Sequence, residues 1–179
     1  MLDLETLSTA NNARIVAIGA VKFLASQGVY DKFYQAIATE PFDDIEPGTD
    51  YNGFDVSEDT LNWWRGQGEE ARKVFTDHDA VTIWSAINKF KQWVLEDEEL
   101  GNVRMWGNGS SFDNVILTSA YDLCGMEKPW RFYNDRCYRT IKNTTLSEAK
   151  LKRIGTHHNA VDDAESQALH LLDMGANLR

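Results

Sequence analysis

A long apolar segment, a turn and a second, alternating segment constrain the fold more than any other feature of the sequence. Residues 14–23 read RIVAIGAVKF, a run rich in β-branched and aliphatic side chains that is typical of a buried strand. A Gln27-Gly28 turn follows, and residues 28–37 alternate as a hairpin partner would. The sequence therefore predicts an antiparallel pair of strands near the start of the chain.

Helices and short strands are expected after this hairpin. A capping-box pattern at Ser57 predicts a helix start, and residues 79–99 carry a broad apolar face at helical spacing. The other expected elements are a strand at 103–106, a serine-capped helix at 110–125, a bulged strand at 130–141 and a helix at 160–175. This order predicts an α/β fold in which helices cover a mixed sheet. At 179 residues, one domain over residues 1–179 is the expectation.

Composition narrows the classes of function. With 28 acidic and 18 basic residues the net charge is −10, which argues against broad coating of duplexes because phosphate contacts need Lys and Arg. A small site for one strand end stays open. The sequence shows no apolar run that could span a bilayer and no signal peptide. Cys124 and Cys137 lack metal-ligand spacing, so a reducing, cytoplasmic setting is expected.

Two carboxylates stand close together in the opening MLDLETL. In a strand, Asp3 and Glu5 project to the same side, where two anions repel and tend to take up protons. A divalent cation removes that penalty, and hard oxygen ligands suit Mg²⁺ or Mn²⁺. Taken alone, this common pattern is more often a solvent-facing polar edge.

Two later stretches hold further candidate residues. Asp113 follows a short strand and a loop with two glycines in WGNGSSFDNVIL, where ligands of α/β sheets gather. It could equally do no more than complement the helix dipole. In HHNAVDDA, a histidine before a helix could be a general base or a surface cap. Spacing alone does not separate His157 and Asp162 from His158 and Asp163.

Together, the order of DLET, FDN and HNAVDDA resembles the DEDDh-type 3′–5′ exonucleases, the superfamily of ribonuclease T and polymerase proofreading subunits. The resemblance covers nearly the whole chain, and DTLNWW and WGNGSSFDNVIL are most similar to small phage and bacterial members. The family pattern H-x-A-x-x-D-A selects His158 and Asp163. Only Met1 and Leu2 precede the acidic pair, whereas the family strand normally has several apolar residues there. The strand is thus either short or begins upstream of Met1.

The resemblance implies an RNase H-like fold, a mixed sheet with helices on both faces. It implies two ions, Mg²⁺ or Mn²⁺, between four carboxylates, with a histidine as general base. These residues would be Asp3, Glu5, Asp113, Asp163 and His158. The implied reaction releases nucleoside 5′-monophosphates from the 3′ end of single-stranded DNA or RNA. Related enzymes are often dimers, which makes a homodimer a further expectation.

Substrate contacts are expected around these motifs. By resemblance, the backbone and side chains of Thr6 and Leu7 would hold the terminal nucleotide. Asn108 and Phe112, in the second motif, are further candidate contacts, although core packing is the stronger interpretation for Phe112. Residues 128–153 carry eight of the 18 basic residues, which indicates either a solvated face or a track for a single strand.

Within that basic segment, Arg139 is the preferred phosphate contact. The adjacent Trp63 and Trp64 do not share a helix face, so at least one is expected in the core. Two other classes of function stay open: a non-catalytic nucleic-acid-binding or interaction module on this fold, and an RNase H-like endonuclease. No residue chooses between DNA and RNA.

Overall fold

A five-stranded mixed sheet forms the centre of the computed structural model, which describes residues 1–175. Its strands lie in the order β3-β2-β1-β6-β7, with β2 antiparallel to both β1 and β3, β6 parallel to β1, and β7 parallel to β6. The strands are β1 (Leu2–Thr6), β2 (Ile15–Leu24), β3 (Gly28–Ala36), β6 (Met105–Gly107) and β7 (Asp135–Cys137). The predicted hairpin is confirmed.

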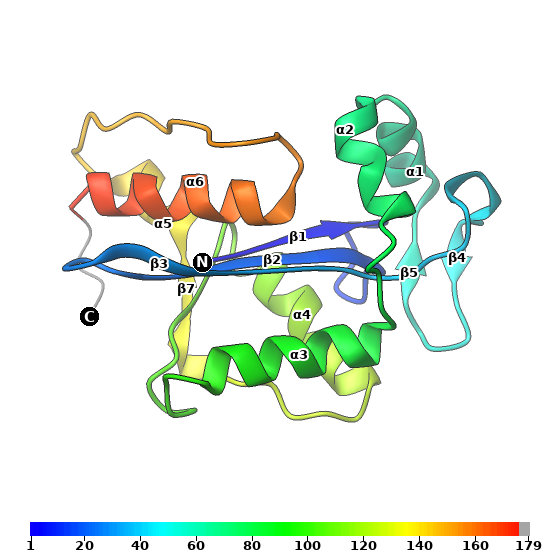
Figure 1. The fold of residues 1–179 in the computed structure, drawn as a ribbon, viewed down its shortest axis with the longest axis horizontal. Helices are drawn as coiled ribbons and strands as arrows, with labels where there is room; N and C mark the ends of the chain where they lie inside the picture. The colour runs from blue at the N-terminus through cyan, green and yellow to red at the C-terminus, as the bar shows by residue number, and fades with distance from the viewer. Residues whose placement is uncertain (176–179) are drawn as a thin grey trace.

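Helices cover both faces of this sheet (Figure 1). One face carries α5 and α6, the other carries α3 and α4, and α1 and α2 stand at one end. The helices are α1 (Glu58–Arg65), α2 (Glu69–Arg72), α3 (Ile83–Leu95), α4 (Asp113–Leu123), α5 (Tyr138–Thr144) and α6 (Ala160–Asp173), and a small sheet pairs β4 (Gly48–Thr49) with β5 (Asp55–Val56). The predicted architecture is confirmed. Within residues 1–175, no helix is long and apolar enough to cross a bilayer.

The two tryptophans of α1 are divided between core and surface. Ser57 caps this helix by accepting the N–H of Thr60, as the sequence predicts. Trp64 is fully buried and donates from Nε1 to the carbonyl oxygen of Thr6 at 2.9 Å, whereas Trp63 is 42% exposed. The expectation that at least one tryptophan is a core residue is confirmed, and Trp64 ties α1 to the end of β1.

Gly19 allows α6 to approach the sheet closely. A Cβ atom at this position would lie 2.1 Å from the carbonyl carbon of Ala160, so no side chain fits between β2 and the start of α6. Gly19 pairs with Asp3 across the two strands. The first turn of α6, which includes Asp163, is therefore brought beside β1.

Residues 130–141 are not a bulged strand, and this prediction is wrong. They form a 3₁₀ turn, the three residues of β7 and then α5. Trp130 is buried and donates from Nε1 to Asp135 Oδ1 at 2.8 Å, which anchors the turn, while Phe132 is exposed. The aromatic residues that suggested a strand thus belong to a turn, and Arg139 lies on α5.

The predicted serine cap of the helix at 110–125 is also wrong. The helix α4 begins at Asp113, and no side chain caps its first turn. The N–H of Phe112 donates instead to the carbonyl oxygen of Gly109 at 2.7 Å. This bond closes a turn that contains both serines, so they precede the helix rather than cap it.

Candidate active site

Three carboxylates from two elements meet above the sheet. Asp3 and Glu5 project from β1, and Asp163 comes from the first turn of α6. One carboxylate oxygen from each lies within 4.8 Å of the other two. These carboxylates lie close together because alternate residues of β1 face the same side and because α6 packs closely against the sheet at Gly19.

The fourth predicted carboxylate, Asp113, approaches β1 from the other side. Its Oδ1 accepts the N–H of Leu4, the residue between Asp3 and Glu5, at 3.2 Å. The strand β6 pairs with β1 only at Leu2 and Gly107, so the Asp113 side chain takes the place of a backbone partner beyond that point. Asp113 is 3% exposed. Of the four acidic residues named from the sequence, two therefore lie on β1 and the other two approach it from α4 and α6.

Two further residues, which the sequence motifs did not indicate, contact these carboxylates. Gln167 Nε2 donates to Asp3 Oδ1 at 2.8 Å, and Arg153 donates to Asp163 Oδ1 at the same distance. Gln167 lies four residues after Asp163 on α6, so the helical spacing could have predicted that the two side chains share a face. Arg153 comes from the long segment before α6, and no spacing rule could have placed it.

The structure also separates the two possible registers of the third motif. Asp163 Oδ2 accepts the backbone N–H of His158 at 3.0 Å and faces the carboxylate cluster. The neighbouring Asp162 turns away and accepts the N–H of Thr156 at 2.7 Å. The ring of Trp63 packs edge-on against His158, with 4.8 Å between ring centroids. The geometry therefore favours His158 and Asp163, although their catalytic roles stay a prediction.

The cluster is electrostatically unfavourable without a cation. Burial, reinforced by the neighbouring carboxylates, raises the pKa of Glu5 to about 9 and holds the pKa of Asp3 well above its usual range. Burial also raises the pKa of Asp113 to about 6, against the effect of the Leu4 N–H. Carboxylate oxygens are the ligands that Mg²⁺ and Mn²⁺ prefer, so the donor set fits the predicted divalent cations.

We expect metal-free protein to lose stability as pH rises from about 4.5 toward about 9, partly through Glu5. In the unfolded chain this carboxyl ionises near pH 4.5, whereas in the folded chain it keeps its proton to about pH 9. The folded state then binds more protons, so the free energy of unfolding falls with pH, by at most about 1.4 kcal/mol per pH unit for one site. Denaturant unfolding in EDTA between pH 5 and pH 9 measures this slope.

Glu5→Gln provides the control, because its amide does not titrate. Its slope should be shallower than that of the wild-type protein, and Mg²⁺ should flatten the wild-type slope by favouring ionised carboxylates. Identical slopes for the two proteins in EDTA would contradict the assignment of the raised pKa to Glu5.

The predicted substrate contacts differ in how far they are buried, and the two that follow the first motif are both buried. Leu7 is fully buried in the core, and its N–H and C=O bond to Arg14 and Ser57. Its side chain packs in the same core cluster as Trp64, and its contact with a nucleotide stays a prediction. Thr6 is also buried and donates its hydroxyl to the carbonyl oxygen of Ser8.

The contacts predicted near the second motif lie closer to the surface. Asn108 is partly buried, and its Oδ1 atom has no hydrogen-bond partner within the described chain. Phe112 packs against the core cluster on the α3 and α4 side, in line with the stronger of its two readings. The Arg139 guanidinium lies against Gly109, and its charge lowers the pKa of Asp113. Arg139 is therefore positioned near the carboxylate cluster.

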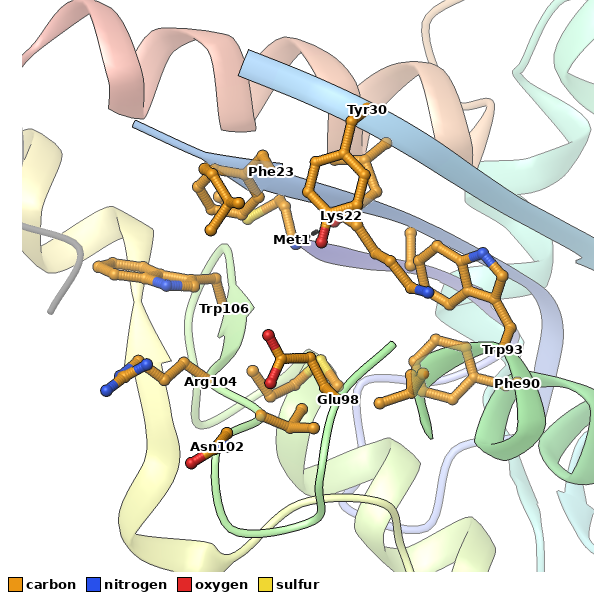
Figure 2. A pocket seen from close by; sticks show the side chains of 16 residues that line it. Met1, Lys22, Phe23, Tyr30, Phe90, Trp93, Glu98, Asn102, Arg104 and Trp106 are labelled. Carbon is orange, nitrogen blue, oxygen red and sulfur yellow. Dashed lines mark hydrogen bonds between the residues drawn. The ribbon is translucent and has the colours of Figure 1, made fainter. Parts of the chain in front are cut away.

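A hollow of about 530 Å³ opens beside the cluster, with Glu5, Tyr34 and His158 in its wall. A separate cavity of about 150 Å³ lies at the start of β1, where Figure 2 shows Trp93 and Trp106 on opposite sides of the opening. Its wall contains none of the five predicted catalytic residues. The hollow at Glu5 thus adjoins the candidate catalytic residues, whereas the cavity at the start of β1 does not.

Comparisons with known proteins identify the family and the fold. Residues 1–174 match the family described as the 3′–5′ exoribonuclease Rv2179c-like domain. The chain is 25% identical over 159 residues to an exodeoxyribonuclease of Enterobacteria phage T4, in an alignment that covers 78% of this chain and 68% of that protein. Its fold is similar to the nuclease domain of 3′hExo, a DEDDh family member solved bound to rAMP, with a TM-score of 0.61 and 16% identity over 97% of this chain and 88% of that one. The predicted RNase H-like fold is confirmed.

Proposed function

The chain belongs to the 3′–5′ exoribonuclease Rv2179c-like family and is a 3′–5′ exonuclease of the DEDDh type, and we propose that it hydrolyses the terminal phosphodiester of single-stranded nucleic acid with two divalent cations. The observation that carries this proposal is the close approach of the Asp3, Glu5 and Asp163 carboxylates. The Asp113 carboxylate accepts the backbone N–H of Leu4, the residue between Asp3 and Glu5. Four carboxylates balance the charge of two Mg²⁺ or Mn²⁺ ions.

The residues of the cluster have distinct proposed roles. The four carboxylates would hold the cations, which supply charge stabilisation for an in-line displacement at phosphorus. His158 lies beside the hollow at Glu5 and takes a proton from the attacking water. The new bond joins the water oxygen to phosphorus, the bond to the 3′ oxygen of the preceding nucleotide breaks, and that oxygen takes up a proton from solvent. The products are a nucleoside 5′-monophosphate and a shortened strand with a 3′-hydroxyl.

The state of the base is compatible with this role. Burial, together with the neighbouring His157, lowers the pKa of His158, against the opposing effect of Asp163. A lowered pKa leaves the imidazole neutral at neutral pH, as a proton acceptor must be. Trp63 restricts the ring from one side, which would keep its orientation fixed.

The names of related proteins point to both kinds of nucleic acid. The family description specifies an exoribonuclease, whereas the phage T4 relative is an exodeoxyribonuclease. The chemical difference is the 2′-hydroxyl, which a terminal-nucleotide pocket either admits or refuses. We therefore propose a single strand with a 3′-hydroxyl as the substrate and treat the sugar as the variable to be tested.

One set of oligomers tests this function. DNA and RNA strands of the same sequence, labelled at the 5′ or the 3′ end, are incubated with Mg²⁺, Mn²⁺ or EDTA. We expect immediate release of a labelled mononucleotide from the 3′ end, a ladder from the 5′ label, and no reaction in EDTA. A circular single strand should survive. Cleavage of the circle would indicate an endonuclease, and metal binding without turnover would indicate a binding module.

We expect Arg139→Gln to raise KM, because Arg139 would contact a substrate phosphate close to the cluster. Loss of one phosphate contact should also make the log–log salt dependence of binding shallower by about 0.7 for a single strand. Fluorescence anisotropy with a catalytically inactive background gives this slope, and steady-state rates give KM for dinucleotides and long strands.

Arg104→Gln is the matched control, since Arg104 is an exposed arginine that precedes β6 at the end opposite Asn108. It should leave KM and the salt slope unchanged. A rise in KM that is confined to long strands would place Arg139 on a track, whereas an equal rise for dinucleotides would place it at the terminal nucleotide. No change in either quantity would show that Arg139 belongs to an ordinary solvated face.

A further inference from the structure

Two consecutive histidines and one carboxylate form a second cluster beside the acidic one. The rings of His157 and His158 lie 3.7 Å apart between centroids, with 32° between their planes. One ring nitrogen of each and one carboxylate oxygen of Asp163 lie within 4.8 Å of one another. Asp163 is therefore shared with the group that contains Asp3 and Glu5.

The backbone at His158 brings the two imidazoles together. Its φ angle is 65°, and His158 is the one residue other than glycine with a positive φ among residues 1–175. In an extended chain consecutive side chains point to opposite sides, and a left-handed residue breaks that alternation. Such a conformation is strained for a residue with a Cβ atom.

Two contacts hold this conformation. The His158 N–H donates to Asp163 Oδ2 at 3.0 Å, and Trp63 packs edge-on against the His158 ring. The tight turn is closed by the N–H of Asn159, which donates to the carbonyl oxygen of Thr156 at 3.1 Å. The juxtaposition of the two imidazoles is thus fixed by the turn and its neighbours.

Two imidazole nitrogens and a carboxylate oxygen are a different donor set from four carboxylates. Imidazole suits Zn²⁺ and its neighbours in the transition series, whereas Mg²⁺ prefers oxygen. His157 is exposed and stands outside the H-x-A-x-x-D-A pattern, which begins at His158. We propose that His157, His158 and Asp163 bind a transition-metal ion of the Zn²⁺ class, at a site that adjoins the one for the catalytic cations and shares Asp163 with it.

Access to this site has a modest electrostatic cost. Arg153 pairs with Asp163 Oδ1 at 2.8 Å, and its side chain is 51% exposed. The Asp163 side chain is 13% exposed, but the guanidinium is half-exposed and can move into solvent when a cation replaces it.

Occupation of the site would stop the nuclease, an inference that rests on the proposed function of His158 and Asp163. A metal-bound imidazole nitrogen has no lone pair for a proton, so His158 would no longer serve as general base. Asp163 would at the same time be drawn away from the catalytic cations. The same ion class would therefore act as a reversible inhibitor.

Calorimetric titration with Zn²⁺ alone tests the binding site, and Co²⁺ provides a visible spectrum that reports nitrogen ligation. We expect His157→Ala to weaken Zn²⁺ binding by about tenfold or more. His78→Ala, which removes another exposed histidine, and Glu5→Gln should bind Zn²⁺ like the wild-type protein. Equal affinity in His157→Ala and wild type, or loss of binding in Glu5→Gln alone, would overturn the proposal.

Inhibition is tested by adding Zn²⁺ to reactions supported by Mg²⁺. His157→Ala should keep its basal rate and need about tenfold more Zn²⁺ for half inhibition. The same Zn²⁺ sensitivity in both proteins would overturn the inhibitory role. Because calorimetry requires no turnover, Zn²⁺ binding that depends on His157 in an inactive protein would refute the proposed catalytic function and leave the metal site standing.

Discussion

Replacing Asp163 with Asn should reduce the nuclease rate by at least about 10³-fold, which corresponds to roughly 4 kcal/mol of transition-state stabilisation. Asp163 contributes one of the three carboxylate oxygens that lie within 4.8 Å of one another. An amide has nearly the same shape but lacks the negative charge that a divalent cation requires. Single-turnover rates on a 5′-labelled oligomer at saturating Mn²⁺ measure the loss, and Asp113→Asn should behave alike.

The adjacent Asp162 offers a matched control. It turns away from the cluster and accepts the N–H of Thr156, a bond that the amide oxygen of Asn can also accept. Asp162→Asn should therefore keep the rate within a few-fold of wild type. Circular dichroism and thermal melting establish that each variant is folded. Near wild-type turnover in Asp163→Asn, or an equal loss in Asp162→Asn, would contradict the metal-site assignment.

The parts of the fold that the sequence predicted are those in which local pattern and tertiary packing agree. Residues 14–37 carry a strand period and a turn, and they form β2 and β3. Residues 130–141 failed because the aromatic residues that favour strands are used differently there. Trp130 bonds to Asp135 to close a turn, and Phe132 faces solvent. Composition alone does not distinguish these uses.

The carboxylates of the site could be predicted because strand and helix periods fix which side chains share a face. Asp3 and Glu5 follow from the period of two, and the family pattern supplied the register that chose Asp163 over Asp162. Gly19 could not be recognised, since its role depends on the distance between β2 and a helix 140 residues later in the chain. Arg153 is similar, because a long segment without regular structure delivers it to Asp163.

Leu7 is a position where the resemblance predicts a contact that the local structure does not display. The position after the first motif was expected to touch a nucleotide. In this chain Leu7 fills the core beside Trp64, and both of its backbone hydrogen-bonding groups are used. Contact between this side chain and a nucleotide would require the surrounding core to open, so the contact stays a prediction.

We further expect His158→Ala to lose about 10²–10⁴-fold in rate, the usual contribution of a general base. His157→Ala should stay within a few-fold of wild type in the absence of Zn²⁺, because His157 is exposed and has no proposed role in the hydrolysis itself. The two substitutions remove the same side chain from adjacent positions whose rings stack at 3.7 Å. The difference between their rate losses therefore shows what the position of His158 contributes, because the chemical group removed is the same in both variants.

The pH–rate profile gives a second, independent test of His158. Because burial and His157 lower the pKa of His158, the rate at saturating metal should rise with pH through a limb below the ordinary histidine pKa of about 6.5. The imidazole accepts a proton only in its neutral form, so this limb should be present in wild type and His157→Ala and absent in His158→Ala. An unchanged limb in His158→Ala would assign it to the carboxylates, and equal rate losses in the two variants would mean that the base is another group.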